Sequence, residues 1–174
     1  LSDNHVLSIV EDREGVLWVG TAAGGLNALD RQSDSFRTYR ANPADPLSLS
    51  SDAVRCVFED SQGNLWVGTE TGGLNLFNRT AQTFTQFRNR PGDATSLSSD
   101  EVRAIYEDRN GTLWIGTRAG INRLDRPHGR FTHYRYNSSD IYSISSDSIW
   151  ALYEDRGGVL WIGTGGGGLS KYAG

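Results

Sequence analysis

Paired carboxylates recur along the chain and are the residue pattern with the most obvious chemical potential. The dipeptide Glu-Asp occurs at Glu11-Asp12, Glu59-Asp60, Glu107-Asp108 and Glu154-Asp155. Two adjacent carboxylates can serve as general acid and base, or they can contribute to a calcium site. However, each pair stands at the start of a turn, where an Asp side chain accepts hydrogen bonds from the backbone that follows. We therefore interpret the four pairs as structural turn-formers and not as catalytic groups.

The other residues suited to chemistry form no recognisable site. The histidines His5, His128 and His133 share no metal-ligand spacing, and no serine lies in a Gly-x-Ser-x-Gly sequence. Cys56 is the single cysteine, which excludes an internal disulfide and a cysteine-rich metal site. The glycine-rich stretch Gly165 to Gly168 is not followed by a helix that could bind a phosphate. We predict no catalytic residues, no metal and no cofactor.

Composition narrows the class of protein. The chain has 174 residues, 37% apolar and 22% charged, and a formal net charge of −4. These values are typical of a globular protein. An acidic chain lacks the excess of basic residues that nucleic-acid-binding proteins use to neutralise phosphates. No apolar run reaches the roughly 18–20 residues of a membrane span. With 21 glycines, 10% aromatic residues and four prolines, the chain favours tight turns between aromatic strands, and hence an all-β fold.

A repeat of about 48 residues organises the whole sequence. The segment Leu-Trp-(Val/Ile)-Gly-Thr occurs four times, with tryptophans at positions 18, 66, 114 and 161. In the second copy, β-branched and aromatic residues separated by turn signals predict four strands. The expected strands are Val54 to Glu59, Leu65 to Thr69, Leu74 to Phe77 and Phe84 to Arg88. Each copy is therefore predicted to be a four-stranded antiparallel meander.

Repeats of 40–50 residues with four short strands are typical of β-propeller blades. Large side chains alternate on both faces of the expected strands, so both faces of each small sheet must be covered, as they are between adjacent blades. No stretch shows the 3.6-residue period of a helix. We expect Trp18, Trp66, Trp114 and Trp161 to form the repeated structural core. The expected blades span residues 1–48, 49–96, 97–143 and 144–174.

The repeat resembles a known family. The sequence Glu-Asp-x-x-Gly-x-Leu-Trp-(Val/Ile)-Gly-Thr-x-x-Gly-Gly-Leu-Asn, seen at Glu59 to Asn75, is similar to the two-component regulator propeller repeat. The lead-in Ser-Leu-Ser-Ser-Asp, at Ser48 to Asp52 and Ser96 to Asp100, is similar as well. The resemblance implies large propellers, often seven-bladed, in the periplasmic or other extracytoplasmic sensor regions of bacterial hybrid histidine kinases. Many such sensors respond to oligosaccharides. The chain contains no kinase, so the resemblance does not extend to signalling.

The last repeat is incomplete. It supplies strands at Ile149 to Glu154, Leu160 to Thr164 and Leu169 to Tyr172, and then stops at Gly174. Leu1 to His5 aligns with a linker and cannot provide the outer strand. An open strand edge invites pairing with another chain. We expect either a homo-oligomer, in which two chains complete an eight-bladed ring, or a fragment of a larger propeller. A closed four-bladed ring is the less favoured alternative.

A binding site is best sought where the repeats differ. The second residue of the first strand is Leu7, Arg55, Arg103 or Trp150, and the turn after Gly-Thr varies too. Both positions are expected on one rim, near the propeller axis. Arginine forks suit anions, and aromatic faces suit sugar rings. We hypothesise a mouth that binds an oligosaccharide or another polar or anionic ligand through three arginines, a tryptophan platform and a nearby tyrosine, namely Arg55, Arg103, Arg118, Trp150 and Tyr142. In the alternative, these arginines are solvated or pair with linker carboxylates.

Three functions remain open from the sequence. The first is a non-enzymatic ligand-recognition module that resembles sensor propellers. The second is a structural or protein-interaction scaffold, either natural or amplified by design, since the copies are so alike. The third is an enzyme of the propeller lyase or glycosidase kind, for which the sequence offers no catalytic constellation. We favour the first, with neither nucleic acid nor a membrane as partner.

Overall fold

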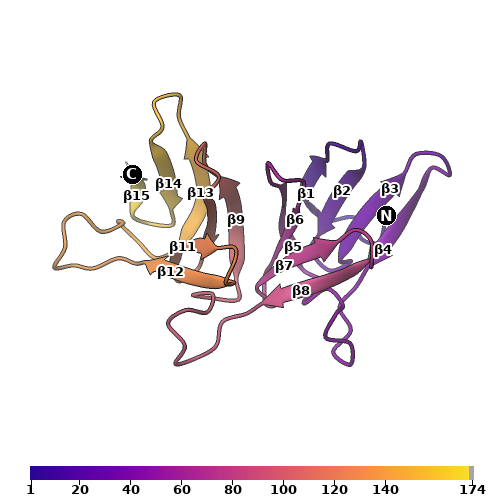
Figure 1. Cartoon of the computed structure of the whole chain (residues 1–174), viewed down its shortest axis with the longest axis horizontal. Helices are drawn as coiled ribbons and strands as arrows, with labels where there is room; N and C mark the ends of the chain where they lie inside the picture. Colours follow the sequence, from indigo (N-terminus) through magenta and orange to yellow (C-terminus); the bar gives the residue numbers. More distant parts are fainter. Residues whose placement is uncertain (173–174) are drawn as a thin grey trace.

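The computed structural model describes residues 1–172, which form fifteen β-strands and no helix (Figure 1). The strands make three four-stranded sheets and one three-stranded sheet, all antiparallel and in chain order. We name the sheets blades 1 to 4. Blade 1 has β1 (Val6–Glu11), β2 (Leu17–Thr21), β3 (Leu26–Asp30) and β4 (Ser35–Tyr39). Blade 2 has β5 (Val54–Glu59), β6 (Leu65–Thr69), β7 (Leu74–Asn78) and β8 (Thr83–Phe87). Blade 3 has β9 (Val102–Glu107), β10 (Leu113–Thr117), β11 (Gly120–Asp125) and β12 (Arg130–Tyr134). Blade 4 has β13 (Ile149–Glu154), β14 (Leu160–Thr164) and β15 (Gly168–Tyr172).

The predicted all-β propeller fold is confirmed, and most strand bounds agree with the expectation. The first two strands of blades 2 and 4 begin and end where predicted. The outer strand of blade 2 begins and ends one residue earlier than expected, at Thr83 and Phe87, because Thr83 pairs with Asn78 across the β7–β8 turn. The third strands of blades 2 and 4 are each one residue longer than expected, to Asn78 and from Gly168. Blade 4 has three strands within residues 1–172, as expected from its truncated repeat. No helix that could cross a bilayer occurs in this part of the chain.

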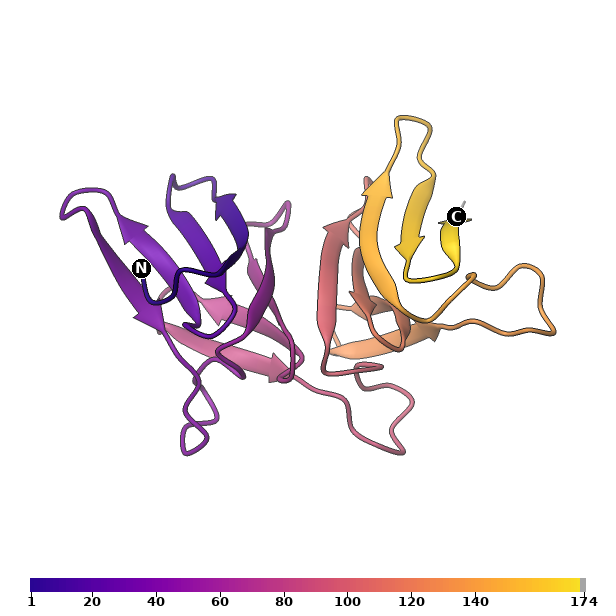
Figure 2. The ribbon, with the colours of Figure 1, turned by 180° about the vertical axis from the view of Figure 1, so that it is seen from behind.

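The first strands of successive blades lie side by side. β1 packs beside β5, β5 beside β9 and β9 beside β13, so each blade contacts its neighbour in sequence. Figures 1 and 2 show blades 1 and 4 at opposite ends of the molecule, with the first two blades in one half and the last two in the other. The described chain is thus an open arc of blades and not a closed ring. Within residues 1–172, one face of blade 1 and one face of blade 4 contact no other blade.

Three hydrophobic clusters hold the arc together, one at each interface between blades. Trp18 packs with Val54, Val57 and Phe77 of blade 2 in the first. Trp66 and Trp114 occupy the same position in the second and third clusters. All three tryptophans are 3% exposed. Burial of such large rings supplies much of the free energy that joins the blades.

Close contact between blades depends on the glycine that follows each tryptophan by two residues. A Cβ on Gly68 would lie 2.6 Å from Cγ1 of Val102 in blade 3, and a Cβ on Gly116 would lie 2.6 Å from Cγ2 of Ile149 in blade 4. The equivalent Gly163 faces no further blade, and its nearest neighbour is Ala151 of its own sheet, at 3.3 Å. The invariant Gly of the repeat therefore sets how closely the sheets approach.

Candidate functional site

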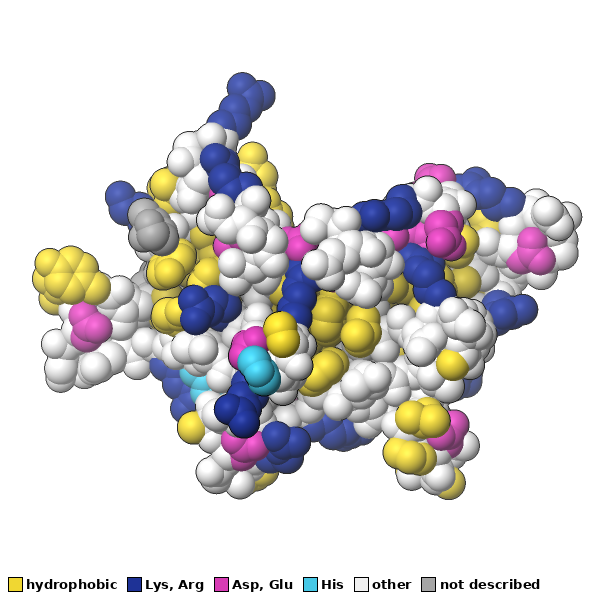
Figure 3. Space-filling model, in the orientation of Figure 1, with side chains coloured by type: hydrophobic (Ala, Val, Ile, Leu, Met, Phe, Trp, Pro, Cys, Tyr) yellow, Lys and Arg dark blue, Asp and Glu magenta, His cyan; other side chains and the backbone are white. Residues whose placement is uncertain are grey.

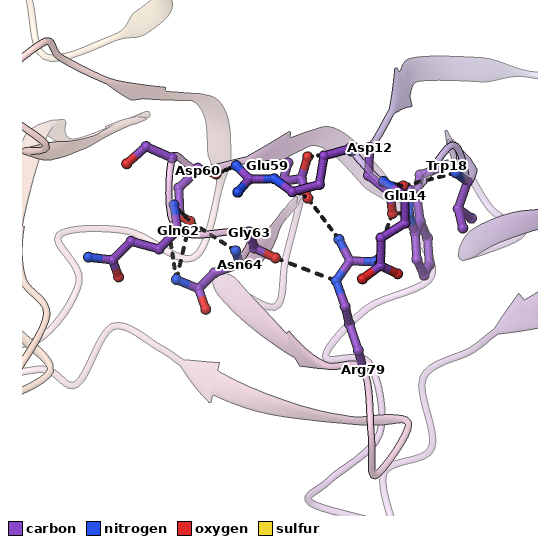
Figure 4. Close-up of polar contacts among 12 residues, drawn as sticks. Asp12, Glu14, Trp18, Glu59, Asp60, Gln62, Gly63, Asn64 and Arg79 are labelled. Carbon is purple, nitrogen blue, oxygen red and sulfur yellow. Dashed lines mark hydrogen bonds and ion pairs between the residues drawn. The ribbon is translucent and has the colours of Figure 1, made fainter.

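The repeated Asp organises a turn and holds the tryptophan of the next strand. Asp60 Oδ1 accepts hydrogen bonds from the backbone N–H of Gln62 and Asn64, at 3.0 and 2.9 Å (Figure 4). Asp60 Oδ2 accepts one from Trp66 Nε1 at 2.8 Å. Gly63 completes the turn with φ +86°, a conformation that favours glycine. The same contact joins Asp and Trp in the other blades, at Asp12–Trp18, Asp108–Trp114 and Asp155–Trp161.

An arginine from the following blade neutralises two of these buried aspartates. Arg79 Nη1 lies 2.7 Å from Asp12 Oδ2, and Arg126 Nη1 lies 2.9 Å from Asp60 Oδ2. Burial alone would raise the pKa of Asp60, but the hydrogen bonds from Trp66 and Asn64 and the charge of Arg126 outweigh it and hold the pKa below its usual range. Both aspartate side chains are fully buried. They are ionised structural anchors with no free oxygen directed at a substrate.

The glutamate of the second, third and fourth pairs links its blade to the preceding one. Glu59 Oε2 accepts a hydrogen bond from the backbone N–H of Arg13, and Glu154 Oε2 accepts one from that of Arg109, both at 2.8 Å. Glu107 accepts the equivalent bond from Ser61. The sequence indicates the role of the pairs in turns but not this link between blades. The signal that could have revealed it is the constant position of Glu beside Asp in every copy.

No acid–base or metal centre emerges elsewhere in residues 1–172. Within that range, no group of three or more His, Cys, Asp or Glu side chains is placed to hold a metal ion. His128 pairs with Asp125 at an exposed turn, and His133 contacts the carbonyl oxygen of Ser96 in a linker. These contacts position turns and linkers and converge on no common cavity.

The predicted ligand residues of the first strands stand at β-bulges. In every blade the pairing between the first two strands skips the second residue of the first strand, which is Leu7, Arg55, Arg103 or Trp150. A bulge redirects the side chain of the extra residue and is often found beside binding sites. The linker before each first strand hydrogen-bonds the turn between the second and third strands, as in Glu70 N to Ala53 O at 2.9 Å. The predicted rim is therefore present, and the bulges project from it.

All three predicted arginines converge on one carboxylate at this rim. Glu101, from the linker before β9, lies 2.6 Å from Arg103 Nη2, 3.7 Å from Arg118 Nη1 and 3.9 Å from Arg55 Nη2. Arg55 also pairs with Glu70 at 2.8 Å. The Arg55 and Arg103 side chains are partly buried, whereas that of Arg118 is 72% exposed. The cluster thus contains both hydrogen-bond donors and acceptors, and Arg118 is its accessible cation.

Trp150 adds an aromatic surface to the cluster. The guanidinium carbon of Arg103 lies 4.1 Å from the centroid of the Trp150 ring, a cation–π contact, and Arg103 Nη1 donates to Ser148 Oγ at 2.7 Å. Trp150 is nevertheless 53% exposed. We call Arg55, Glu101, Arg103, Arg118 and Trp150 the mouth cluster.

Tyr142 does not belong to the mouth cluster. It lies in the linker before β13, is 90% exposed, and lines a separate cavity with Trp114 and Tyr134. The sequence analysis expected Tyr142 near the mouth, but Tyr142 occupies the position of Leu47 and Thr95 in the other linkers, whose carbonyl oxygens face the outer strands. The mouth cluster itself can stack a ring on Trp150, donate hydrogen bonds from Arg118 and accept them at Glu101. It holds no nucleophile with an adjacent base.

Comparison with solved structures places the chain among propellers. The extracellular domain assigned to the hybrid two component system BT3049 from B. thetaiotaomicron is 34% identical, with a TM-score of 0.86 over 99% of this chain. The chain spans 24% of that domain. PorZ, a surface component of the type-IX secretion system of Porphyromonas gingivalis, is 21% identical over 97% of this chain and 26% of its own, with a TM-score of 0.68. Virginiamycin B lyase from Staphylococcus aureus is 14% identical over 98% of this chain and 56% of its own, with a TM-score of 0.67. At these lower identities the likeness shows the fold alone.

Comparison with families gives a direct assignment. No curated protein sequence matches the chain significantly. The family described as "Two component regulator propeller" matches residues 1–23, 48–71, 96–119 and 137–166. These segments contain all four Asp-to-Trp turns and all four bulges. The family resemblance expected from the repeat is therefore confirmed, and the chain belongs to the two component regulator propeller family.

Proposed function

We propose that the chain is a non-enzymatic ligand-recognition module in the extracytoplasmic part of a bacterial sensor, and that the mouth cluster binds an oligosaccharide. The half-exposed Trp150, held by Arg103 at a β-bulge, is the observation that carries the proposal. The family and the 34% identical extracellular domain support the sensor context. Because the chain spans about a quarter of that domain, the behaviour of the whole sensor is part of the proposal.

The chemistry of the cluster favours a polar, hydroxyl-rich ligand over a strongly anionic one. Glu101 and the neighbouring Glu70 offset two of the three arginines, so the mouth cluster counted together with Glu70 has a net charge of about +1. A sugar ring can stack on Trp150 while its hydroxyl groups bond to Arg118 and Glu101. Since the cluster contains no nucleophile–base pair, we expect binding without turnover.

Replacing Trp150 with alanine is expected to weaken oligosaccharide binding by about 30-fold, the typical cost of removing an aromatic hot spot of about 2 kcal/mol. The measurement is a titration of the chain with gluco-, xylo- and manno-oligosaccharides of four to six units, followed by tryptophan fluorescence and calorimetry. Tyr142→Ala is the matched control, because Tyr142 is exposed but lies outside the cluster. Absence of saturable binding, or equal affinity in both variants, would contradict the proposal. Shortening of the sugars would restore the enzyme alternative.

A second candidate function, an interaction scaffold built from two copies of the chain, is favoured by the two uncovered end faces. Ile9 of blade 1 is 63% exposed, although the equivalent Val57 of blade 2 is 6% exposed. Tyr153 and Leu169 of blade 4 are both 62% exposed. Leu74, which occupies the position of Leu169 in blade 2, is fully buried. The uncovered face of blade 4 carries Trp161 and corresponds to the face that, in blades 1 to 3, packs against the next blade. It therefore fits blade 1 of a second copy.

The charges at the two end faces are also complementary, because they repeat an ion pair that joins blades 3 and 4. Arg109 in blade 3 pairs with Glu154 in blade 4, and Arg156 occupies the position of Arg109 at the open end. The partner equivalent to Glu154 in blade 1 is Glu11, whose side chain is 58% exposed. An Arg156–Glu11 pair between copies would repeat the internal link. We propose that two chains associate head to tail in this way.

Light scattering across protein concentrations tests this association. We expect the mass to rise from 19.1 kDa towards twice that value. The single variants Arg156→Glu and Glu11→Arg should weaken association, and an equimolar mixture of the two should restore it, since each pair of faces then regains opposite charges. A chain that stays monomeric at every concentration would overturn this second function and leave the first untouched.

A further inference from the structure

The arginines of the mouth cluster differ in how far the protein already binds them. The Arg103 side chain is 10% exposed, its Nε donates to Glu101 Oε1 at 2.8 Å, and its Nη1 donates to Ser148 Oγ at 2.7 Å. Arg55 Nη2 donates to Glu70 Oε1 at 2.8 Å. Charge-assisted bonds of this kind are strong. A ligand that drew either guanidinium group away would have to replace an ion pair.

Arg118 is the arginine whose donors remain available. It lies in the turn between β10 and β11, and its side chain is 72% exposed. Glu101 Oε2 lies 3.7 Å from Arg118 Nη1, which is too long for a hydrogen bond. Within residues 1–172 the guanidinium group of Arg118 therefore has a carboxylate beside it but no acceptor bonded to it.

The two carboxylate oxygens of Glu101 stand in different environments. Oε1 faces the bound arginines, with Arg103 Nη2 at 2.6 Å and Arg55 Nη2 at 3.9 Å. Oε2 accepts no hydrogen bond from residues 1–172 and is accessible to solvent. Glu101 is thus held through one oxygen and presents the other, next to Arg118, to the mouth.

Arg118 Nη1 and Glu101 Oε2 therefore form a neighbouring donor and acceptor. A hydroxyl group both donates and accepts, so two adjacent hydroxyl groups of a sugar ring can satisfy the two atoms together. An ionised carboxylate offers acceptors only. It would gain a bond to Arg118 but would place its negative charge beside Oε2, and the repulsion of like charges costs binding free energy.

This arrangement does not depend on where the arc begins or ends. Arg55 belongs to β5 and Arg103 to β9, while Glu101 precedes β9 and Arg118 follows β10. Blades 2 and 3, which carry these residues, each lie between two other blades. The neighbours of the donor and acceptor are therefore all present in the described chain.

The wider surface offers no comparable selection by charge. Figure 3 shows basic and acidic side chains intermingled over the face of the molecule that it presents. Mixed charges produce weaker long-range fields than a surface of one sign. Discrimination between a neutral and an acidic ligand must then come from the groups that contact it.

We propose that Glu101 is the specificity-determining residue of the mouth cluster, and that it selects neutral sugars with adjacent hydroxyl groups and rejects uronic acids. This inference rests on the oligosaccharide function proposed above. Arg103 holds the carboxylate through Oε1, Arg118 supplies the matching donor, and Oε2 supplies the repulsion. Specificity then arises from a repulsive element as well as an attractive one.

The test compares sugars that differ only at C6, by calorimetry with the whole chain. The pairs are cellotetraose with the β-1,4-linked tetramer of glucuronate, and mannotetraose with the corresponding tetramer of mannuronate. We expect the wild-type chain to bind the neutral member of a pair about 10-fold more tightly. Glu101→Gln should lower the neutral affinity about 3-fold, because an amide oxygen accepts without a charge, and raise the acidic affinity about 10-fold. The ratio of the two affinities then changes by about 30-fold.

Glu70→Gln is the matched control. It removes the same charge, but Glu70 is 43% exposed and pairs with Arg55, not with Arg118. We expect the affinity ratio to change by less than about 3-fold, since solvent screens a charge that does not touch the ligand. Arg118→Ala is the second test variant, at an exposed position where folding is unaffected. It should weaken neutral binding about 10-fold, because the donor of the pair is lost.

Three results would count against Glu101 as the selecting residue while leaving the oligosaccharide function in place. In each of them neutral sugars bind the wild-type chain. The first is an affinity ratio that Glu101→Gln leaves unchanged, and the second is an equal change in Glu70→Gln. The third, which decides if Glu101→Gln does not fold, is full neutral affinity in Arg118→Ala. Absence of binding of every sugar to the wild-type chain would instead overturn the oligosaccharide function and this inference together.

Discussion

Replacing Asp60 with alanine is expected to lower the free energy of unfolding by about 3–5 kcal/mol, the usual cost of breaking a buried, hydrogen-bonded ion pair from one side. The variant leaves Trp66 Nε1 and the backbone N–H of Asn64 without an acceptor. Arg126 loses its contact across the interface and keeps only Glu107. The turn, the core tryptophan and the link between two blades are thus weakened together.

Urea unfolding followed by fluorescence and circular dichroism measures this loss. Asp155→Ala is the matched control, because Asp155 holds Trp161 in the same way but is only partly buried and pairs with no arginine of a following blade within the described residues. We expect a clearly smaller loss in the control when both are measured at a protein concentration at which the chain is monomeric. Equal losses would show that the ion pair between blades contributes nothing.

Replacing Trp66 with alanine should cost about 3–5 kcal/mol, as typical for truncation of a buried aromatic side chain. Trp66 is 3% exposed and packs between Phe87 and the residues of blade 3 that include Ile105 and Leu113. Its removal opens a cavity at the central interface of the arc, where neither sheet can move inward without disturbing its other neighbour. The variant also leaves Asp60 without one of its donors.

The control for this variant is Trp161→Ala, at the same position in blade 4. That ring faces the uncovered end and is only partly buried, so we expect a loss of about 1–2 kcal/mol. The losses in unfolding free energy of the Trp66→Ala and Trp161→Ala variants are measured by thermal and urea unfolding. A loss at Trp66 no larger than at Trp161 would contradict the view that interfaces between blades, and not the single sheets, stabilise the fold.

The fold could be predicted almost completely because local sequence rules and the repeat agree. Strand residues, turn glycines such as Gly63 and the Trp-bearing core recur at a fixed period, so each copy corroborates the others. The small error at the β8 boundary arose because Thr83 carries no apolar signal and is recruited by pairing with Asn78. Such pairing depends on the partner strand and is not visible in a single segment.

The candidate site was only partly predictable. Variation among the repeats identified Arg55, Arg103 and Trp150 as neighbours on one rim, because equivalent positions of adjacent blades must lie close together. It did not reveal that Glu101 pairs with the arginines, nor that each of the three residues stands at a bulge. Both facts depend on side-chain reach and on strand register. Tyr142 lies in a linker that makes the same backbone turns as the linkers around Asp45 and Asp93. Alignment of Tyr142 with Leu47 and Thr95, whose carbonyl oxygens accept hydrogen bonds from the outer strands, was the signal that could have placed it away from the bulges.

Contacts only between successive blades make the arc behave like a short linear chain of coupled units. Blades 2 and 3 are held on two faces, whereas blades 1 and 4 are held on one, so opening should begin at the ends and proceed inward. Stability in such an array grows with the number of interfaces, and four units share three. Each blade added to either end would therefore contribute a complete new interface while creating only one more sheet, and lengthening the array is a simple route to greater stability.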